Sequence, residues 1–159
     1  MTVSVCSLIL EENQAVAADG AYHVVRFPFG TGESYDEHGM HQMLQPDGHQ
    51  IENWRTDDRS SLIWPSADGW GVITAMIQWE AGNYTELRDQ VVRDPLGLTG
   101  TPNDSTATDH RAPSPGMQCF TKHHELFVHP DVPLAIRVGH NAGGSRALVH
   151  AQFKLAIHT

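Results

Sequence analysis

The feature that most constrains the fold is a succession of short apolar segments separated by turns rich in glycine and proline. The clearest segment is 147–157. Its two alternating sets are Val149, Ala151, Phe153, Leu155 and Ile157 on one side and Leu148, His150, Gln152 and Lys154 on the other. A period of two is typical of an antiparallel strand with one buried face. We therefore expect a chain built from β-strands.

Similar strand signals recur along the chain, at 3–10, 22–29, 62–64, 70–79, 117–127 and 134–138. The segment 84–92 is short and suits a helix or a strand equally well. Many short strands joined by Gly/Pro turns predict an all-β fold, an antiparallel jelly-roll sandwich. We expect residues 1–19 to form a short N-terminal arm or edge strand, and residues 20–159 to form the jelly-roll domain.

Residues 95–116 differ from the rest because they are polar and punctuated by proline and glycine. Such punctuation marks turns and loops, and a long loop without secondary structure is usually functional or mobile. We predict a long surface loop here.

The segment 70–79 is apolar on both of its alternating sides. Trp70, Val72, Thr74 and Met76 form one side, and Ile73, Ala75, Ile77 and Trp79 form the other. A strand of this kind is buried on both faces, or it lies against a neighbouring subunit.

The composition excludes some classes of partner. The net charge is −9, with only ten Lys and Arg in 159 residues, whereas binding to nucleic acid or to an anionic membrane needs clustered cations. The apolar stretch 3–10 is too short to span a membrane, and no basic run precedes it as in a secretory signal. The chain has eleven histidines, which we expect to lie in solvated loops. A role in sensing pH is a further hypothesis.

Several parts of the chain resemble the tumour-necrosis-factor-like jelly roll, a family that includes complement-type globular heads and is also used on bacteriophage particles. The matching pieces lie within 24–36, 62–79, 133–144 and 147–157, among them Leu62 to Pro65 followed by Asp68-Gly69-Trp70 at the entry to a central strand. The resemblance extends over roughly residues 20–159, although the polar stretch 95–116 is longer than the family's pattern. The resemblance implies a homotrimer that buries apolar strand faces around a three-fold axis. Candidates for those faces are the strand 70–79 and the aromatic residues Tyr22, Phe120 and Phe153.

Candidate metal ligands are present, but their spacing is unfavourable. A cupin-like metal site needs histidines two residues apart on a strand, because only alternate residues enter the barrel. His123 and His124 are adjacent, followed by Glu125 and His129; His38 and His41 are three apart, and His140 stands alone. We expect no metal site.

Nucleophilic catalysis has equally little support in the sequence. Cys119 lies near His123 and His124, but it reads as a strand residue, and Cys6 and Cys119 are both expected to be small buried hydrophobic residues. The acidic pairs 11–12, 36–37 and 57–58 suit solvated loops better than calcium binding or general acid–base catalysis. We expect no enzyme, no catalytic residues and no cofactor.

The function that this pattern favours is structural. We expect a trimeric decoration or cement protein on a bacteriophage capsid, made in the host cytoplasm and bound to the major capsid protein. The alternative is a receptor- or glycan-binding tip module of a tail fibre. It would use the loops 31–61 and 95–116, with Trp54, Trp64, Asp57 and Asp58 as contacts. A cupin-like enzyme is a third and weaker alternative.

Overall fold

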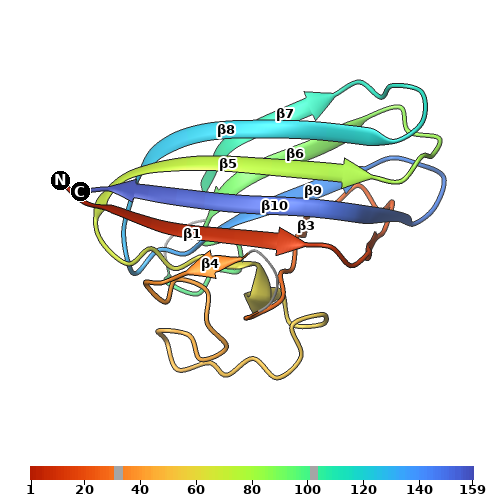
Figure 1. The fold of residues 1–159 in the computed structure, drawn as a ribbon. Coiled ribbons are helices and arrows are strands. Elements are labelled where there is room, and N and C mark those ends of the chain that lie inside the picture. Colours follow the sequence, from red (N-terminus) through yellow and green to blue (C-terminus); the bar gives the residue numbers. More distant parts are fainter. Residues whose placement is uncertain (31–33, 101–103) are drawn as a thin grey trace.

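The computed structural model describes residues 1–30, 34–100 and 104–159. Within these residues the chain forms ten strands and one short 3-10 helix (Figure 1). In chain order they are β1 (Val3–Leu10), β2 (Gln14–Val16), β3 (His23–Val24), β4 (Tyr35–Asp36), η1 (Asp58–Ser61), β5 (Gly69–Trp79), β6 (Leu87–Arg93), β7 (Asp104–Arg111), β8 (Gln118–Val128), β9 (Leu134–His140) and β10 (Arg146–His158). None of the described helical residues belongs to a segment long and apolar enough to cross a bilayer.

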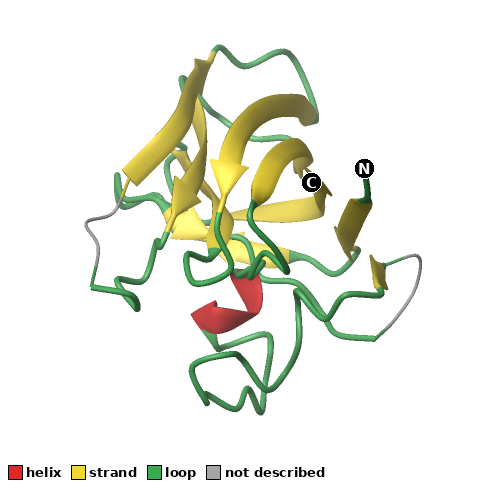
Figure 2. Cartoon of the chain, turned by 90° about the vertical axis from the view of Figure 1, so that its left-hand side faces the viewer, coloured by secondary structure: helices red, strands yellow, loops and turns green. Residues whose placement is uncertain are grey.

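The described strands pair into two antiparallel sheets that pack face to face. The front sheet has the order β4-β1-β10-β5-β8, with β2 also paired to β10, and the back sheet has the order β3-β9-β6-β7. Figure 1 shows the two layers, with both chain ends at the same end of the sandwich, and Figure 2 shows η1 outside it. The expected all-β jelly-roll sandwich is confirmed.

The core lies between the two sheets and follows the alternation of the sequence. On β5 the inner residues Ile73, Ala75, Ile77 and Trp79 are buried. Phe153 of β10 meets Phe27 with ring centroids 6.1 Å apart. Burying each large apolar side chain contributes about 1.5–3 kcal/mol, so these two strands hold much of the stabilising surface.

Strand β10 is confirmed, but its pattern shifts near its start. Ala151, Phe153, Leu155 and Ile157 face the core as expected, whereas at the other end Leu148 is buried in place of Val149. The register with β5 slips between Leu148 and His150. A bulge adds one residue to one strand and so reverses the inward side, which a strict period of two does not anticipate.

Of the two forms expected for residues 1–19, arm or edge strand, the structure shows strands. β1 pairs with β10 from Val3↔His158 to Leu10↔Ala151. Cys6, Leu8 and Leu10 are buried in the core. The chain ends are tied together as well, since the Thr159 backbone N–H donates to the Thr2 carbonyl oxygen at 3.1 Å. Residues 3–10 are therefore part of the folded body, and no free arm exists there.

The prediction of one long loop over 95–116 is wrong, because β7 lies within it. β7 pairs antiparallel with β6, from Leu87↔Arg111 to Arg93↔Asp104, with one register shift. It is an edge strand of the back sheet, and edge strands are commonly polar. That is why Asp104–Arg111 reads as a loop in the sequence. Residues 101–103 of the expected loop lie outside the described part of the chain.

Two other expectations need correction. The segment 22–29 is a strand only at His23–Val24, although Val25 N–H still donates to the Ile136 carbonyl. Around 62–64 a single bridge joins Ile63 to Leu134. The ambiguous segment 84–92 is a strand, β6.

Charged residues close the side of the sandwich between the edge strands β7 and β8. Lys122 of β8 points inward with a side chain 2% exposed, and its Nζ lies 3.0 Å from Asp89 Oδ1 and also contacts Asp109. Arg111 Nε donates to Asp89 Oδ2 at 2.6 Å. Two cations and two carboxylates thus compensate each other, which a buried charge requires.

Candidate functional site

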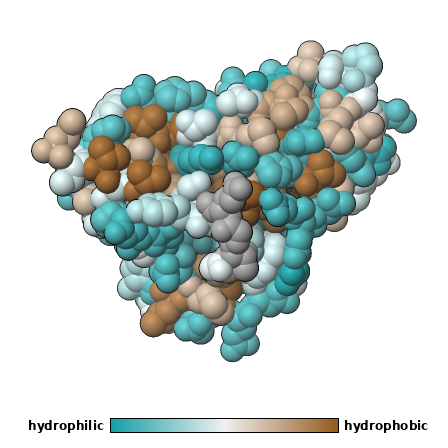
Figure 3. Space-filling model, viewed as in Figure 1, coloured by the Kyte–Doolittle hydropathy of each residue, from teal (hydrophilic) through white to brown (hydrophobic). Residues whose placement is uncertain are grey.

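The outer face of the front sheet is the main candidate site, because two neighbouring rows across its four long strands hold six apolar residues together with His158 and Glu125. At the end that holds the chain termini, one row runs Val3↔His158↔Trp70↔Phe127. The next row runs Val5↔Ala156↔Val72↔Glu125. We call these eight residues the front face patch. Figure 3, which looks onto this side, shows apolar surface at that end.

The residues of the first row are unusually exposed for their type. Trp70 is 47% exposed, Phe127 46% and Val3 46%. Further along the same face, polar residues such as Lys154, Thr74 and His123 form the next row with Ser7. Contiguous exposed apolar surface on a soluble protein usually marks a contact surface.

One polar interaction holds the patch in shape. Trp70 Nε1 donates to Glu125 Oε1 at 2.9 Å, and His123 Nε2 lies 3.4 Å from Glu125 Oε2. The hydrogen bond from Trp70 and the neighbouring His123 keep the pKa of Glu125 below its usual range. Glu125 is thus an anion that accepts a hydrogen bond from the indole ring of Trp70.

The histidines singled out in the sequence are not brought together. His123 is exposed on the outer face, and His129 pairs with Asp68 at 2.7 Å. His140 is buried between the sheets, where Nε2 contacts the Val16 carbonyl at 2.8 Å and Nδ1 accepts from Ala142 N–H. Among the described residues, no three His, Cys, Asp or Glu side chains are grouped to hold a metal ion.

The other histidines of the sequence analysis have separate environments. His124 faces the inner side of β8, where burial lowers its pKa. His38 is exposed in the loop after β4, and His41 is buried. The two are therefore not a pair on one surface.

The two cysteines differ. Cys6 is buried in the core, and burial raises the pKa of its thiol well above the usual range. Cys119 is exposed on the outer side of β8, opposite Gln78. The prediction is correct for Cys6 and wrong for Cys119, because β8 is an edge strand and the outer side of its first residues is not covered.

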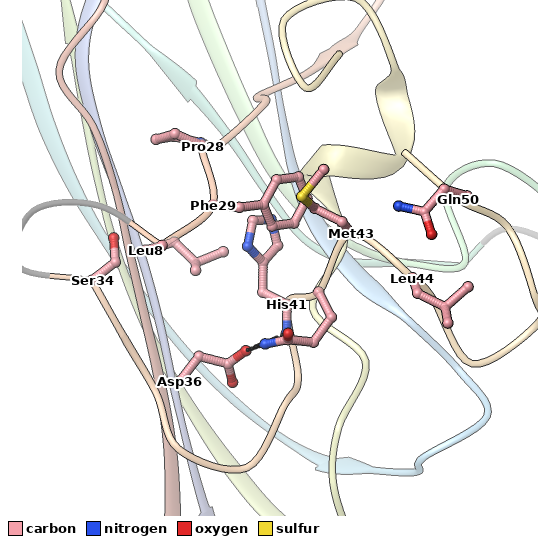
Figure 4. Close-up of a pocket in the computed structure, with 11 residues that line it drawn as sticks. Leu8, Pro28, Phe29, Ser34, Asp36, His41, Met43, Leu44 and Gln50 are labelled. Atoms are coloured by element: carbon pink, nitrogen blue, oxygen red, sulfur yellow. Dashed lines mark hydrogen bonds between the residues drawn. The ribbon is translucent and has the colours of Figure 1, made fainter. Parts of the chain in front are cut away.

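A pocket of about 660 Å³ lies beside β1 and β4 (Figure 4). Its floor includes His41, which stacks on Phe29 with centroids 4.3 Å apart and contacts the Ser60 carbonyl through Nε2 at 2.7 Å. Asp36 accepts hydrogen bonds from the backbone N–H groups of Met40 and His41, each at 2.7 Å. The polar groups therefore hold the loop together and offer little to a ligand.

Comparison with known proteins decides the fold. No protein-family model matches the chain, and no curated protein does. Among solved structures, murine APRIL at pH 8.0 has a TM-score of 0.60 at 10% identity, covering 99% of this chain and 100% of that one. The Eiger TNF from S. frugiperda reaches 0.59 at 12% identity, covering 100% and 94%. The globular domain of zebrafish complement 1qA reaches 0.58 at 12% identity, covering 96% and 94%.

The fold is a tumour-necrosis-factor-like jelly roll. The resemblance found in the sequence is thereby confirmed for the fold, and sequence identities near 10% carry nothing beyond it.

Within this TNF-like jelly roll, the aromatic residues expected at a subunit face lie elsewhere. Phe153 is fully buried in the core. Phe120 packs against the core from the inner side of β8, with Arg111 over its ring. Tyr22 lies beneath Arg88 and Arg137. Of the expected set, only the strand 70–79 contributes to the front face patch.

The tryptophans expected to contact a glycan in the TNF-like jelly roll are partly covered. Trp54 is half-buried against the core, with the Arg55 guanidinium 4.7 Å from its ring centroid. Trp64 is only 6% exposed. The carboxylates Asp57 and Asp58 are paired with His49 and Arg26. Residues 31–33 of the expected recognition loop 31–61 lie outside the described residues.

Proposed function

We propose that this chain is a structural protein that forms a homotrimer through the front face patch and decorates a bacteriophage capsid. The patch is the single observation that carries the proposal. Val3, Trp70 and Phe127, each close to half exposed, lie in one row that crosses four strands. In a solitary chain these side chains face water, and burying them against a second copy is favourable at about 25 cal/mol per Å².

A cyclic arrangement suits this surface. Each copy carries the same patch, and closed symmetric rings of identical chains avoid open-ended assembly. The polar rows beyond the patch, with Lys154 and His123, provide the rim that protein interfaces usually have around an apolar centre. Three copies on one axis would bind a shell with high avidity even if each contact were weak.

The viral part of the proposal has separate support. Jelly rolls of this kind occur on bacteriophage particles. In this role the chain would bridge neighbouring subunits of the major capsid protein and stabilise the shell. Because β1 is part of the core, shell contacts would come from loops and not from residues 1–19 as an arm.

The experiment is immunolabelling of intact particles of the source virus with antibody against this chain, viewed by electron microscopy. We expect labels distributed regularly over the capsid. Label confined to the tail tip would support the alternative function, and unlabelled particles would contradict both.

The alternative, a receptor- or glycan-binding tip module, is favoured by one groove. It has a volume of about 500 Å³ and is lined by Pro46, Asp47, Trp64, Leu98, Thr99, Pro130 and Asp131. The groove lies between Pro46 and Asp47 on one side and Leu98 and Thr99, before β7, on the other, which belong to the two regions that the hypothesis names. A glycan array probed with the purified chain tests it: Asp131→Ala should abolish any saturable signal, whereas an empty array would remove the glycan form of the hypothesis.

A further inference from the structure

Arg137 is a partly buried cation that has no carboxylate partner among the residues that the structure describes. It lies on β9, and its Nε and Nη2 both donate to the Gln90 Oε1 atom, at 3.2 and 2.8 Å. The ring of Tyr22 lies 5.5 Å from the guanidinium carbon. Five other arginines of the described chain each contact a carboxylate: Arg26, Arg55, Arg59, Arg88 and Arg111.

These contacts leave part of the hydrogen-bonding capacity of Arg137 unused. A guanidinium has five N–H donors, and two of them are used on one neutral amide oxygen. Burial lowers the pKa of Arg137, although Tyr22 partly offsets that effect. An anion at this position would accept hydrogen bonds from the donors that Gln90 leaves unused.

Arg137 lines a small pocket of suitable chemistry. The pocket has a volume of about 160 Å³, and most of the side chains that line it carry a polar group. It lies against the outer side of the back sheet, between β3, β9 and the chain at 95–96. Its wall is formed by Gln14, Ala15, Tyr22, His23, Val24, Arg26, Asp58, Pro95, Leu96 and Arg137.

The charges of this pocket are unequal. Arg26 is neutralised by Asp58, since Nη1 lies 3.1 Å from Oδ1. His23 Nε2 is held by Asp19 at 2.8 Å. Arg137 therefore leaves the pocket with one uncompensated positive charge, in a chain of net charge −9.

Hydrogen bonds already hold the residues around Arg137 in place without a ligand. Gln14 Nε2 donates to the Val24 carbonyl at 2.9 Å, and Gln14 Oε1 accepts from Arg26 N–H at 2.9 Å. Arg137 itself is in register with Val24 on one side and Gln90 on the other. A preorganised site loses little entropy on binding.

We propose that this pocket binds one small oxyanion, a carboxylate or a phosphate group, through the free donors of Arg137. A planar guanidinium matches the two oxygens of such a group. The Arg26–Asp58 pair and Tyr22 form the walls that limit its size. The site is separate from the front face patch, so the proposal does not depend on trimer formation.

The test is a titration of the ¹⁵N-labelled chain at pH 7 and constant ionic strength, with sodium phosphate and sodium acetate as separate probes. We expect saturable shifts of backbone amide signals at 22–26 and 136–138 with one or both probes. A response to phosphate alone assigns a phosphate ligand, and a response to acetate alone assigns a carboxylate. At ten times the dissociation constant the midpoint of thermal unfolding should rise by about 3–6 °C.

Three variants decide the role of Arg137. Arg137→Gln should abolish the saturable shifts. Arg137→Lys should weaken binding about tenfold, because lysine keeps the positive charge but lacks the planar pair of N–H donors of the guanidinium. Arg55→Gln removes an equal charge from the exposed pair with Glu12 and should bind like the parent chain. The same spectra show whether each variant is folded. Absence of saturable shifts with either probe, or unchanged shifts in folded Arg137→Gln, would overturn the proposal.

Discussion

The outer faces of the two sheets differ in how far the rest of the chain covers them. The outer side of the back sheet is covered by the chain itself: Leu62 and Trp64 pack over Val24 and Ala135, and Leu96 and Leu98 add to this second cluster. The outer side of the front sheet has no such cover over Trp70 and Phe127, which remain about half exposed.

This difference separates stability from assembly. The apolar residues outside the back sheet are buried within one chain and therefore contribute to folding. The equivalent residues outside the front sheet contribute little until another surface meets them. The segment 70–79 is apolar on both sides for two different reasons. Its inner side packs in the core between the sheets, and its outer side forms part of the exposed front face patch.

The largest loss of stability is expected for a change in the segment around Leu62 and Trp64, which covers the back sheet. Trp64→Ala should destabilise the chain by about 3–5 kcal/mol, since it leaves a cavity between the cover and the back sheet. Trp70→Ala, the matched change on the open face, should cost less than about 1 kcal/mol in the single chain. Urea unfolding of the parent chain and both variants, at a protein concentration at which native mass spectrometry shows single chains, measures the difference. Equal losses would show that the two faces are alike.

The next effect is a pH dependence of the unfolding free energy, which arises beside the segment that covers the back sheet. His41 Nε2 contacts the Ser60 carbonyl, and Met40 accepts from Trp64 N–H, so residues 40–41 support the covering segment. Burial lowers the pKa of His41 from 6.5 to about 4. The unfolded chain therefore takes up a proton first, and stability falls as the pH drops from about 6.5 to 4, by about 3 kcal/mol.

Unfolding free energies measured at pH 7 and at pH 4.5 test this expectation, with His41→Gln as the comparison. The variant should lose less stability on acidification than the parent chain, because Gln does not titrate. An identical loss in both proteins would assign the acid sensitivity to other groups.

Strand patterns with one buried side could be predicted from sequence because the period of two is local. Ala151, Phe153 and Leu155 lie inward as their alternation requires. Val149 does not face the core as the alternation predicts, because the bulge before His150 depends on the pairing with β5 and not on β10 alone. β7 was missed since polar edge strands and loops have the same composition.

The candidate sites were only partly accessible to sequence reasoning. Trp70 was found through its alternating neighbours, but the in-register row with Val3 and Phe127 depends on which strands are adjacent. Arg137 carried no signal at all. Its lack of a carboxylate partner follows from the residues that three-dimensional packing places around it, above all Gln90 and Tyr22.

A smaller effect concerns thiol accessibility. Cys119 lies on the front sheet's outer side, whereas Cys6 is buried. A thiol reagent should modify Cys119 in the native chain and Cys6 only after unfolding. If copies cover the front face, Cys119 should react roughly tenfold faster in Trp70→Glu than in the parent chain. Mass spectrometry of timed samples measures both rates, and equal rates would place Cys119 outside the contact.

The mass of the native assembly tests the central claim most directly. Native mass spectrometry should give about 52 kDa for the parent chain, three times its 17.5 kDa. Trp70→Glu should give the single-chain mass, because it replaces the largest apolar side chain of the front face patch with a second carboxylate beside Glu125. Leu44→Glu, at an exposed apolar loop residue, should remain trimeric. A parent chain that is monomeric at micromolar concentration, or a trimeric Trp70→Glu variant, would contradict the account.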